Sequence, residues 1–275
     1  MYYIGIDLGG TNIKGALVSE TGEIAREVSR PTRVELGAEA VCDGIAAVIT
    51  ELSSGVDRTS LGGVGLGCPG TVDDETGCVL YANNLGWKNF DLRAAVKSRT
   101  DFDLRIGNDA NVAAVAEVLV GCAKGAQSAV IVTLGTGVGG GIVFNGKVWN
   151  GFHGVGSEIG HMILELDGEP CTCGNYGCVE RYCSATAIIR MARELCAVHP
   201  ESEIVKVCEG DLNRVNAKVV FDAAKNGDEI ALKVFHRYVK YLGQLVASLV
   251  NCIGPEVIVL GGGVSKAGDF LLDAV

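Results

Sequence analysis

The sequence lacks both the basic charge needed to bind nucleic acid and an apolar run long enough to span a membrane. Its 23 Lys and Arg stand against 33 Asp and Glu, and the formal net charge is −10. Because phosphate backbones are bound by basic surfaces, this balance argues against a nucleic-acid partner. The most apolar late stretch, 238–264, is interrupted by Lys240, Gln244, Pro255 and Glu256, which excludes it as a single membrane span.

A secretion signal and a disulfide framework are also missing. The chain opens directly on a strand pattern, so we expect no signal peptide. Its 11 cysteines are an odd number and most lie in apolar segments, which is typical of reduced thiols and predicts a cytoplasmic protein. We expect such reduced core thiols at Cys42, Cys68, Cys78, Cys122, Cys183, Cys196, Cys208 and Cys252.

What the sequence does contain is an α/β pattern with a duplicated unit. The length of 275 residues and the 39 glycines are typical of one large or two medium globular α/β domains. Strand patterns at 2–8 and 13–19 enclose the turn GGTN, and 129–134 opens a second strand–GTGVGG–strand unit. The duplication predicts two similar halves that face each other across a cleft. Helical periodicity covers 37–54, 91–99, 110–120, 184–197, 215–226 and 228–252, and a last strand is expected at 256–260.

The second glycine turn resembles two nucleotide-binding motifs, and its context excludes both. Gly135, Gly137 and Gly140 fit G-x-G-x-x-G, and 141–147 nearly fits a P-loop. Each motif requires a helix after the loop, whose N-terminus receives the phosphates. Here an apolar strand follows, and Val148 occupies the position where the P-loop requires Ser or Thr.

The two turns instead predict a phosphate site made by two β-hairpins. Backbone N–H groups in a tight glycine turn bind anions without a charged side chain. Asp7, at the end of the first strand, is placed to hold a hydrated Mg2+ between phosphates. Two alternatives stay open: Asp7 caps only the backbone of its own turn, and Thr136 is an ordinary turn residue. The residues predicted to line the nucleotide site are Asp7, Gly9, Gly10, Thr11, Asn12, Lys14, Thr136, Gly137 and the third glycine run Gly261, Gly262 and Gly263.

A tight set of metal-ligating residues lies within 153–180. His161 is followed by Cys171, Cys173 and Cys178, and this Cys3His set predicts a tetrahedral structural zinc site. Glu158 and Glu180 flank the set, so a metal closing this loop would fix the geometry of whatever these two carboxylates touch. The alternative is a glycine-rich surface loop with incidental cysteines.

Several motifs, in order along the whole chain, resemble those of the ROK family of bacterial sugar kinases and related repressors. They are D-L-G-G-T-N at 7–12, N-N-L-G-W at 83–87, G-N-D-A-N at 107–111, G-T-G-V-G-G-G at 135–141, E-I-G-H at 158–161 and C-T-C-G-N-Y-G-C-V-E at 171–180. The resemblance implies a two-lobed α/β fold of the actin-like ATPase (ribonuclease H-like) class. It also implies ATP-dependent phosphorylation of a hexose at its 6-hydroxyl, and the loops look most like those of the family's glucokinases.

The resemblance also assigns roles to individual residues. Asp109 matches the catalytic base, which accepts the proton of the sugar hydroxyl as the phosphoryl group arrives. Residues matched to the sugar are Gly70, Asn83, Asn84, Asn108, Glu158, His161 and Glu180, with His161 also a zinc ligand. Simpler roles remain for some of them: a helix N-cap at Asn108–Asp109, a core histidine at His161 and a solvated helix-start acid at Glu180.

The resemblance further predicts how the chain is organised. The first lobe is expected to cover 1–107 and the second 108–275, with the C-terminus truncated, since family members continue beyond the position of Val275. No winged-helix segment precedes the first strand, which argues against the DNA-binding repressors, and a homodimer is expected. Alternatives to glucose are mannose, fructose, allose and N-acetylmannosamine, with ATP or polyphosphate as the donor. An alternative of another class is a sugar sensor that transfers nothing.

Overall fold

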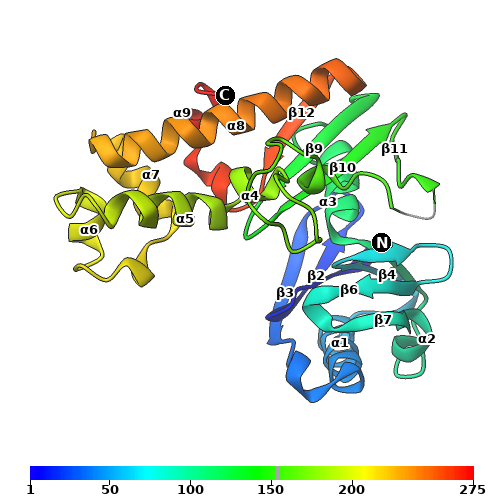
Figure 1. Cartoon of the computed structure of the whole chain (residues 1–275). Coiled ribbons are helices and arrows are strands. Elements are labelled where there is room, and N and C mark those ends of the chain that lie inside the picture. The colour runs from blue at the N-terminus through cyan, green and yellow to red at the C-terminus, as the bar shows by residue number, and fades with distance from the viewer. Residues whose placement is uncertain (153–154) are drawn as a thin grey trace. The chain divides into compact units, whose positions relative to one another are not determined.

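The computed structural model describes residues 1–152 and 155–275, which form two compact units (Figure 1). The first unit comprises Met1–Lys124 with Lys147–Gly156, and the second comprises Gly125–Gly146 with Ser157–Val275. Residues 108–124 therefore group with the first unit, although the sequence places the lobe boundary at 107/108. The reason is that helix α3 (Asp109–Leu119) packs on strands β4 (Leu61–Cys68) and β8 (Leu104–Asn108) of that unit.

The first unit is built on a five-stranded sheet of order β3-β2-β1-β4-β8. Strands β1 to β3 are antiparallel to one another, whereas β4 runs parallel to β1 and β8 parallel to β4. Side chains alternate between the two faces: Ile4, Ile6 and Leu8 are buried in the core, and the residues between them lie on the other face. The bounds of the first three strands are Tyr2–Leu8, Asn12–Ser19 and Ile24–Pro31.

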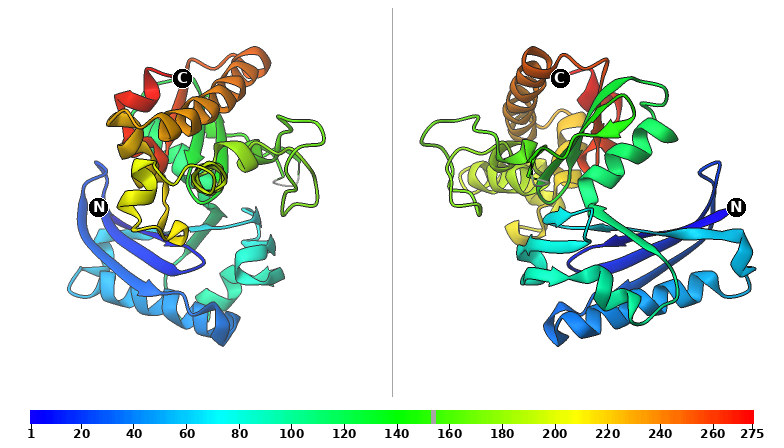
Figure 2. Two further views of the ribbon diagram at one scale, coloured as in Figure 1. Left: turned by 60° about the vertical axis from the view of Figure 1, so that its left-hand side comes forward. Right: turned by 90° about the vertical axis from the view of Figure 1, so that its right-hand side faces the viewer.

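Helix α1 (Ala38–Ser53) lies along one face of this sheet (Figure 2). Its apolar stripe at Val41, Ile45, Val48 and Leu52 is fully buried, and each such side chain contributes about 1.5–3 kcal/mol to folding. The close approach requires a glycine on β2, because a Cβ at Gly15 would overlap Val48. The opposite face of the sheet is free of α1.

A small antiparallel sheet, β5-β6-β7, completes the first unit. Trp87 is 6% exposed and packs on Phe90 with ring centroids 4.6 Å apart, so it is a core residue beneath the Asn83–Leu85 turn. The bounds of the remaining elements are β5 Thr71–Asp73, β6 Cys78–Ala82, β7 Trp87–Asp91, α2 Leu92–Lys97, β11 Lys147–Val148, and the 3-10 turns η1 Val34–Leu36, η2 Arg58–Ser60 and η3 Asn83–Leu85.

The second unit repeats the central plan of the first. Strands β9 (Ser128–Leu134) and β10 (Val138–Phe144) form an antiparallel hairpin, and β12 (Val257–Gly261) runs parallel to β9. The order β10-β9-β12 therefore matches β2-β1-β4, and each hairpin turns over three residues, 9–11 and 135–137. The predicted α/β fold with duplicated strand–glycine turn–strand units is confirmed.

Helices α5, α7 and α8 build the core of the second unit around this sheet (Figure 1). Helix α8 buries a stripe that includes Val234, Tyr238, Leu242 and Leu249, and it ends at Gly254, which adopts the left-handed conformation. Among the described residues, no helix has both the length and the apolarity that a membrane crossing needs. The bounds are α4 Glu180–Cys183, α5 Ala185–Cys196, α6 Glu203–Val207, α7 Ala217–Lys225, α8 Glu229–Ile253, α9 Asp269–Leu272, and the turns η5 Ile159–His161, η6 Leu212–Arg214 and η7 Val264–Ala267.

The cysteines are free thiols throughout the described chain, but the prediction that all those outside the cluster are core residues is wrong for two of them. Cys122 and Cys252 are exposed, because each lies near the end of a helix where the chain leaves the core. Others are deeply buried, and burial raises the pKa of Cys183 to about 12. A buried thiol of this kind is unreactive and acts as a small apolar side chain.

Candidate functional site

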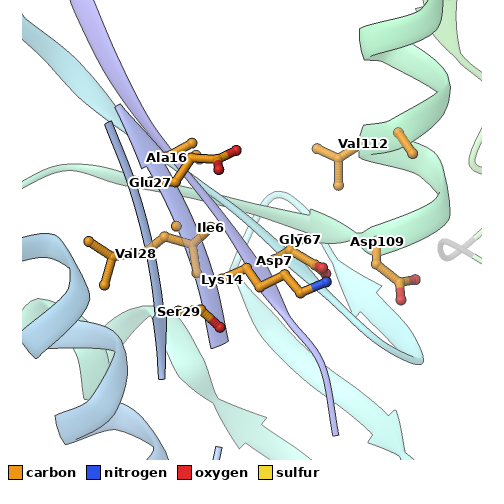
Figure 3. A pocket seen from close by; sticks show the side chains of 14 residues that line it. Ile6, Asp7, Lys14, Ala16, Glu27, Val28, Ser29, Gly67, Asp109 and Val112 are labelled. Atoms are coloured by element: carbon orange, nitrogen blue, oxygen red, sulfur yellow. The ribbon is translucent and has the colours of Figure 1, made fainter. Parts of the chain in front are cut away.

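The face of the first sheet that is free of α1 carries a hollow of about 960 Å³ (Figure 3). Part of its floor has no side chains, because the cross-strand neighbours Gly5 and Gly65 lie there. The space above both is open, since a Cβ at either would meet no atom within 4 Å. Gly67 lies on the same face, where a Cβ would come within 3.0 Å of Val112 Cγ2 on α3. Glycine on β4 thus leaves room for α3 and for the hollow.

Charged side chains line this hollow on three strands and one helix: Asp7 on β1, Lys14 on β2, Glu27 on β3 and Asp109 at the start of α3. Figure 3 shows Asp7, Lys14 and Asp109 pointing into it. Asp7 and Lys14 are cross-strand partners near the end of the β1–β2 hairpin. Neither makes an ion pair with any residue that the structure describes. Both are therefore available to a ligand.

Asp109 begins helix α3 and differs electrostatically from an ordinary surface aspartate. Its side chain remains accessible to water, and its Oδ1 accepts a hydrogen bond from the N–H of Ala110 at 2.8 Å. The surrounding protein nevertheless raises its pKa, first by desolvation and then by the negative charge of Asp7. A carboxylate held in an unfavourable ionised state is a better proton acceptor than a free one.

Asn108 is the N-cap of α3, so one of the simpler roles considered for this pair is confirmed for Asn108. Its Oδ1 accepts from the N–H of Asn111 at 3.1 Å, and its Nδ2 donates to the carbonyl of Gly70 at 2.9 Å. The side chain therefore fixes both the start of the helix and the Gly70 turn. Each amide oxygen has a second lone pair and each amide nitrogen a second hydrogen, which leaves Asn108 able to bind a ligand as well.

The Gly70 turn packs against the end of β6, directly before Asn83, and the Asn83–Asn84 turn lies beside the first glycine loop. Gly70 has φ 89°, and a Cβ there would overlap the carbonyl oxygen of Tyr81, so only glycine fits. A Cβ at Gly10 would come within 3.6 Å of the Cβ of Asn84. The structure therefore brings these predicted sugar and phosphate residues together within the first unit.

The first glycine loop, residues 9–12, is closed by a hydrogen bond from the N–H of Gly9 to the carbonyl of Asn12 at 2.9 Å. Two of its carbonyls are tied to Thr32: the hydroxyl donates to Gly9 O at 2.6 Å and the backbone N–H donates to Thr11 O at 2.9 Å. The N–H groups of Gly10 and Thr11 have no acceptor among the described residues. The loop thus presents unpaired donors, as an anion site requires.

The second glycine loop, residues 135–137, is tied to the start of α5 in the same unit. Gly135 O accepts from the N–H of Ala185 at 2.8 Å, and Thr136 O accepts from the hydroxyl of Thr186 at 2.6 Å. Glu180 accepts a hydrogen bond from the N–H of Val138 at 3.1 Å, so it is not a solvated acid. Its carboxylate would overlap a Cβ at position 137, which explains the glycine there.

The third glycine run follows β12 and lies next to the second loop. Gly262 has φ 86°, and a Cβ there would come within 2.5 Å of the carbonyl oxygen of Leu134, the residue before Gly135. The structure therefore places Gly261 and Gly262 beside the end of β9, directly before the second glycine loop, as a shared nucleotide site in this unit would require.

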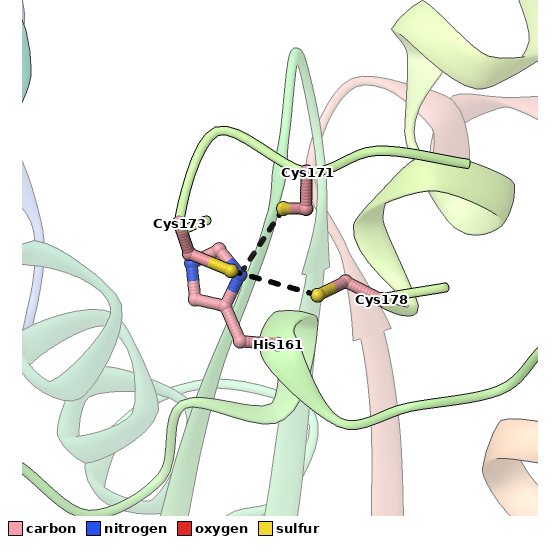
Figure 4. Close-up of side chains that lie close together, drawn as sticks. All are labelled: His161, Cys171, Cys173 and Cys178. Carbon is pink, nitrogen blue, oxygen red and sulfur yellow. Dashed lines mark hydrogen bonds between the residues drawn. The ribbon is translucent and has the colours of Figure 1, made fainter. Parts of the chain in front are cut away.

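The four predicted metal ligands converge in the second unit (Figure 4). One ligand atom from each of His161, Cys171, Cys173 and Cys178 lies within 4.8 Å of all the others. Cys171 Sγ is 3.7 Å from His161 Nδ1, and Cys173 Sγ is 3.6 Å from Cys178 Sγ. Zinc–sulfur bonds of about 2.3 Å in a tetrahedron place two sulfurs about 3.8 Å apart. The donor set and its spacing fit a structural zinc ion.

The four side chains belong to the segment that also carries the two flanking carboxylates. His161 ends the turn η5, which Glu158 directly precedes, and Cys178 lies two residues before Glu180. The chain between the ligands is tightly folded, since Cys171 N–H donates to Asn175 O at 2.8 Å and Gly174 has φ 91°. The alternative of incidental cysteines in a surface loop does not account for this convergence.

Sequence reasoning missed several residues that shape these loops. Thr32 and Thr186 hold loop carbonyls, and Asn150 links Asn111 (3.0 Å) to Asp74 (2.9 Å). Thr32 and Thr186 lie far along the chain from the loop carbonyls that they hold, and Asn150 lies outside the recognised motifs. The only local signal was the Ser184 N-cap, which places Thr186 in the first turn of α5.

Comparison with known proteins agrees with this arrangement. The family model described as "ROK family" matches residues 3–275. The chain is 41% identical over 278 residues to a glucokinase of Halalkalibacterium halodurans, covering 100% of this chain and 84% of that protein. It is also 30% identical over 272 residues to a putative xylose repressor of Caldicellulosiruptor sp., covering 98% of this chain and 68% of that protein.

A solved structure agrees with the fold as well. The crystal structure of a ROK family glucokinase from Streptomyces griseus, in complex with glucose and AMPPNP, superposes with a TM-score of 0.88 at 34% identity. The match covers 100% of this chain and 87% of that one. The chain belongs to the ROK family.

Proposed function

We propose that this protein is an ATP-dependent glucokinase that transfers the terminal phosphoryl group of ATP to the 6-hydroxyl of glucose. The observation that carries the proposal is Asp109, a water-accessible carboxylate of raised pKa in a hollow that also holds Asp7 and Lys14. The similarity to glucokinases over the whole chain supports the same reaction.

Asp109 is the proposed general base. A sugar hydroxyl is a weak nucleophile, and a carboxylate within hydrogen-bond reach accepts its proton as the new O–P bond forms. Asn108 would bind a neighbouring hydroxyl through the lone pair and amide hydrogen that its cap bonds leave over. Gly70, Asn83 and Asn84 would complete the sugar contacts of the first unit.

The two glycine loops are the proposed phosphate ligands. In the first unit, unpaired N–H groups in 9–12 and the Lys14 amine would bind phosphate oxygens and neutralise their charge; in the second unit, unpaired N–H groups in 135–137 would do the same. Asp7 would hold a hydrated Mg2+, which supplies charge neutralisation at the phosphates when bound. Gly261, Gly262 and Gly263 would contact the remainder of the nucleotide.

The Cys3His cluster is the proposed site of a structural Zn2+, with no direct role in phosphoryl transfer. Its four ligands would hold the loop so that Glu158, His161 and Glu180 bind the hydroxyls of the sugar ring from fixed positions. Fixed polar partners discriminate strongly against a sugar that lacks one hydroxyl, because a buried acceptor is then unpaired. A homodimeric state, a cytoplasmic location and the choice of ATP over polyphosphate stay predictions.

Two other functions compete with this one. A kinase for mannose, fructose, allose or N-acetylmannosamine would use the same residues with a different grip on the ring. A sugar sensor is favoured by the similarity to a putative xylose repressor, but a sensor needs neither Asp109 nor unpaired loop donors.

A coupled ADP-release assay with a panel of sugars separates the three. At saturating MgATP, we expect kcat/KM for glucose to exceed that for mannose, fructose and N-acetylmannosamine by at least about tenfold, the discrimination that one fixed hydrogen bond supplies. A higher value for any other sugar identifies a different kinase. Sugar binding without ADP release identifies a sensor.

A further inference from the structure

In both glycine loops, a threonine hydroxyl and a backbone N–H donate hydrogen bonds to loop carbonyls. The donors come from different kinds of secondary-structure element in the two units. In the first loop, the hydroxyl of Thr32 donates to Gly9 O at 2.6 Å. In the second, the hydroxyl of Thr186 donates to Thr136 O at 2.6 Å. In each case a backbone N–H of the same segment holds a second carbonyl: Thr32 N to Thr11 O at 2.9 Å, and Ala185 N to Gly135 O at 2.8 Å.

Holding a carbonyl also fixes the direction of an N–H group. In a planar trans peptide, the C=O of one residue and the N–H of the next point in opposite directions. The Thr32 hydroxyl on Gly9 O therefore directs the N–H of Gly10 away from Thr32. In the same way, the Thr186 hydroxyl on Thr136 O directs the N–H of Gly137 away from α5. Neither N–H has an acceptor among the described residues, so both remain available to a ligand.

We propose that Thr32 and Thr186 are positioning residues for the nucleotide phosphates. Each hydroxyl anchors one peptide plane of a glycine loop, so that the N–H on its far side points at a phosphate oxygen before ATP arrives. Without these bonds, a three-residue turn with glycines would sample many peptide orientations. The conformational entropy lost on ordering the turn would then reduce the affinity for ATP. The inference deepens the proposed function and rests on its assignment of the two loops to phosphate.

The two threonines differ in how strongly their substitution is expected to affect folding stability. Thr32 is 1% exposed, so removing its hydroxyl leaves the partly buried carbonyl of Gly9 without its donor and lowers the stability of the first unit. Thr186 is exposed and lies in the first turn of α5, where Ser184 already caps the helix. Thr186→Val keeps the shape of the side chain and removes only the anchor, so it is the primary test.

The experiment measures binding of MgAMPPNP, inorganic tripolyphosphate and adenosine by calorimetry on the intact protein. Loss of one hydrogen bond to the loop predicts that Thr186→Val weakens MgAMPPNP and tripolyphosphate about five- to tenfold. Adenosine carries no phosphate, so its affinity stays at the parent value. Thr186→Ser keeps the hydroxyl and restores the parent affinity for all three. The control Thr50→Val removes an equivalent exposed threonine bond, to Ala46 O at 2.9 Å in α1, and changes none of them.

Thr32→Val and Thr32→Ser repeat the comparison in the first unit, with the melting temperature recorded to separate folding from binding. The proposal is overturned if Thr186→Val binds MgAMPPNP as the parent does, if Thr186→Ser is as weak as Thr186→Val, or if adenosine loses affinity equally. A parent protein that binds MgAMPPNP but transfers nothing to any sugar contradicts the proposed function alone. A parent that binds neither MgAMPPNP nor tripolyphosphate contradicts both.

Discussion

The two units contain the same β-hairpin with a three-residue glycine turn, yet the structure supports the two turns by different means. In the first unit the turn is held by Thr32, which lies just after the edge strand β3 and is almost fully buried. In the second unit the turn is held by the first turn of α5 and by Glu180, which follows the metal-ligand cluster. One turn therefore depends on a sheet, and the other depends on the start of α5 and on a loop that carries four potential metal ligands.

This difference indicates which property of each unit, catalysis or binding, is more sensitive to substitution. In the first unit the candidate chemistry lies at strand ends: Asp7 near the end of β1, and Asn108 and Asp109 at the junction of β8 and α3. Sheet pairing fixes those positions without any ligand. In the second unit the candidate sugar residues lie at short elements: Glu158 and His161 at the single turn η5, and Glu180 at the start of the four-residue helix α4. Such short elements have little stability of their own, and a bound metal would fix them. Changes to the first unit should therefore alter chemistry, and changes to the second should alter binding.

The largest expected effect is in the first unit. Asp109→Asn keeps the size of the side chain but cannot accept a proton, so kcat is expected to fall by about 10²–10⁴-fold. Affinity for glucose is expected to stay within about tenfold, because the amide oxygen still accepts a hydrogen bond. Because the fold raises the pKa of Asp109, its ionised form is less favourable in the folded chain than in the unfolded one, and the neutral variant is expected to be at least as stable as the parent.

Steady-state kinetics with glucose titrations, together with thermal unfolding, test this prediction. Asp103→Asn is a matched control, because Asp103 is an exposed aspartate of the same unit that pairs only with Lys97 among the described residues. Normal turnover in Asp109→Asn would mean that Asp109 merely belongs to the helix start, and another acid would have to be the base.

The expected metal effect is smaller and concerns the second unit. Cys178→Ser, or removal of zinc with a chelator, is expected to weaken glucose binding about tenfold or more, because Glu158 and Glu180 lose their fixed positions. Binding of tripolyphosphate to the first loop does not depend on the cluster and should change less. Cys122→Ser, which alters an exposed thiol outside the cluster, is the control.

Elemental analysis and calorimetry on the same samples check this. One zinc per chain is expected in the parent and in Cys122→Ser, with a loss in Cys178→Ser. A protein that contains no zinc and still binds glucose with full affinity would remove the proposed distinction between the two units.

The sequence predicted the parts of both units that have a local signal, and it missed those that depend on distant contacts. The duplicated hairpins, helices α1, α3, α5, α7 and α8, and the convergence of His161 with three cysteines follow from periodicity and ligand spacing. Strand β4, with glycines at 62, 63, 65 and 67, was not predicted, because glycine lowers strand propensity. Of these glycines, Gly65 lies on the open floor of the hollow, Gly67 allows the close approach of α3, and a Cβ at Gly62 would overlap the ring of Tyr3. Only the folded sheet shows these contacts.

The supporting residues were missed for the same reason. Thr32 and Thr186 act through hydrogen bonds to carbonyls 23 and 50 residues away, and no local pattern marks such a contact. The N-cap at Asn108 was among the predictions because a cap has a local signature, but its second bond, to Gly70 38 residues away, was not.

The smallest expected effect concerns the electrostatic link between Asp7 and Asp109 within the first unit. A general base must be deprotonated, so kcat/KM for glucose should decline as pH falls through the pKa of Asp109, above the range of an ordinary aspartate at about 3.9. Desolvation is the main cause of that raised pKa and the charge of Asp7 is a lesser one, so Asp7→Asn should move the pKa of Asp109 downward only in part.

Because Asp7→Asn would also disturb the proposed Mg2+ ligand, the cleaner measurement is a carbon-13 carboxyl titration of Asp109 by NMR without nucleotide. The Asp109 resonance should titrate at lower pH in Asp7→Asn than in the parent. Glu20→Gln, a change at an exposed acid whose carboxylate pairs with the N-terminal amine, should leave it unmoved. An unchanged titration in Asp7→Asn would show that desolvation alone tunes the base, and Asp7 would then act on the phosphates without acting on Asp109.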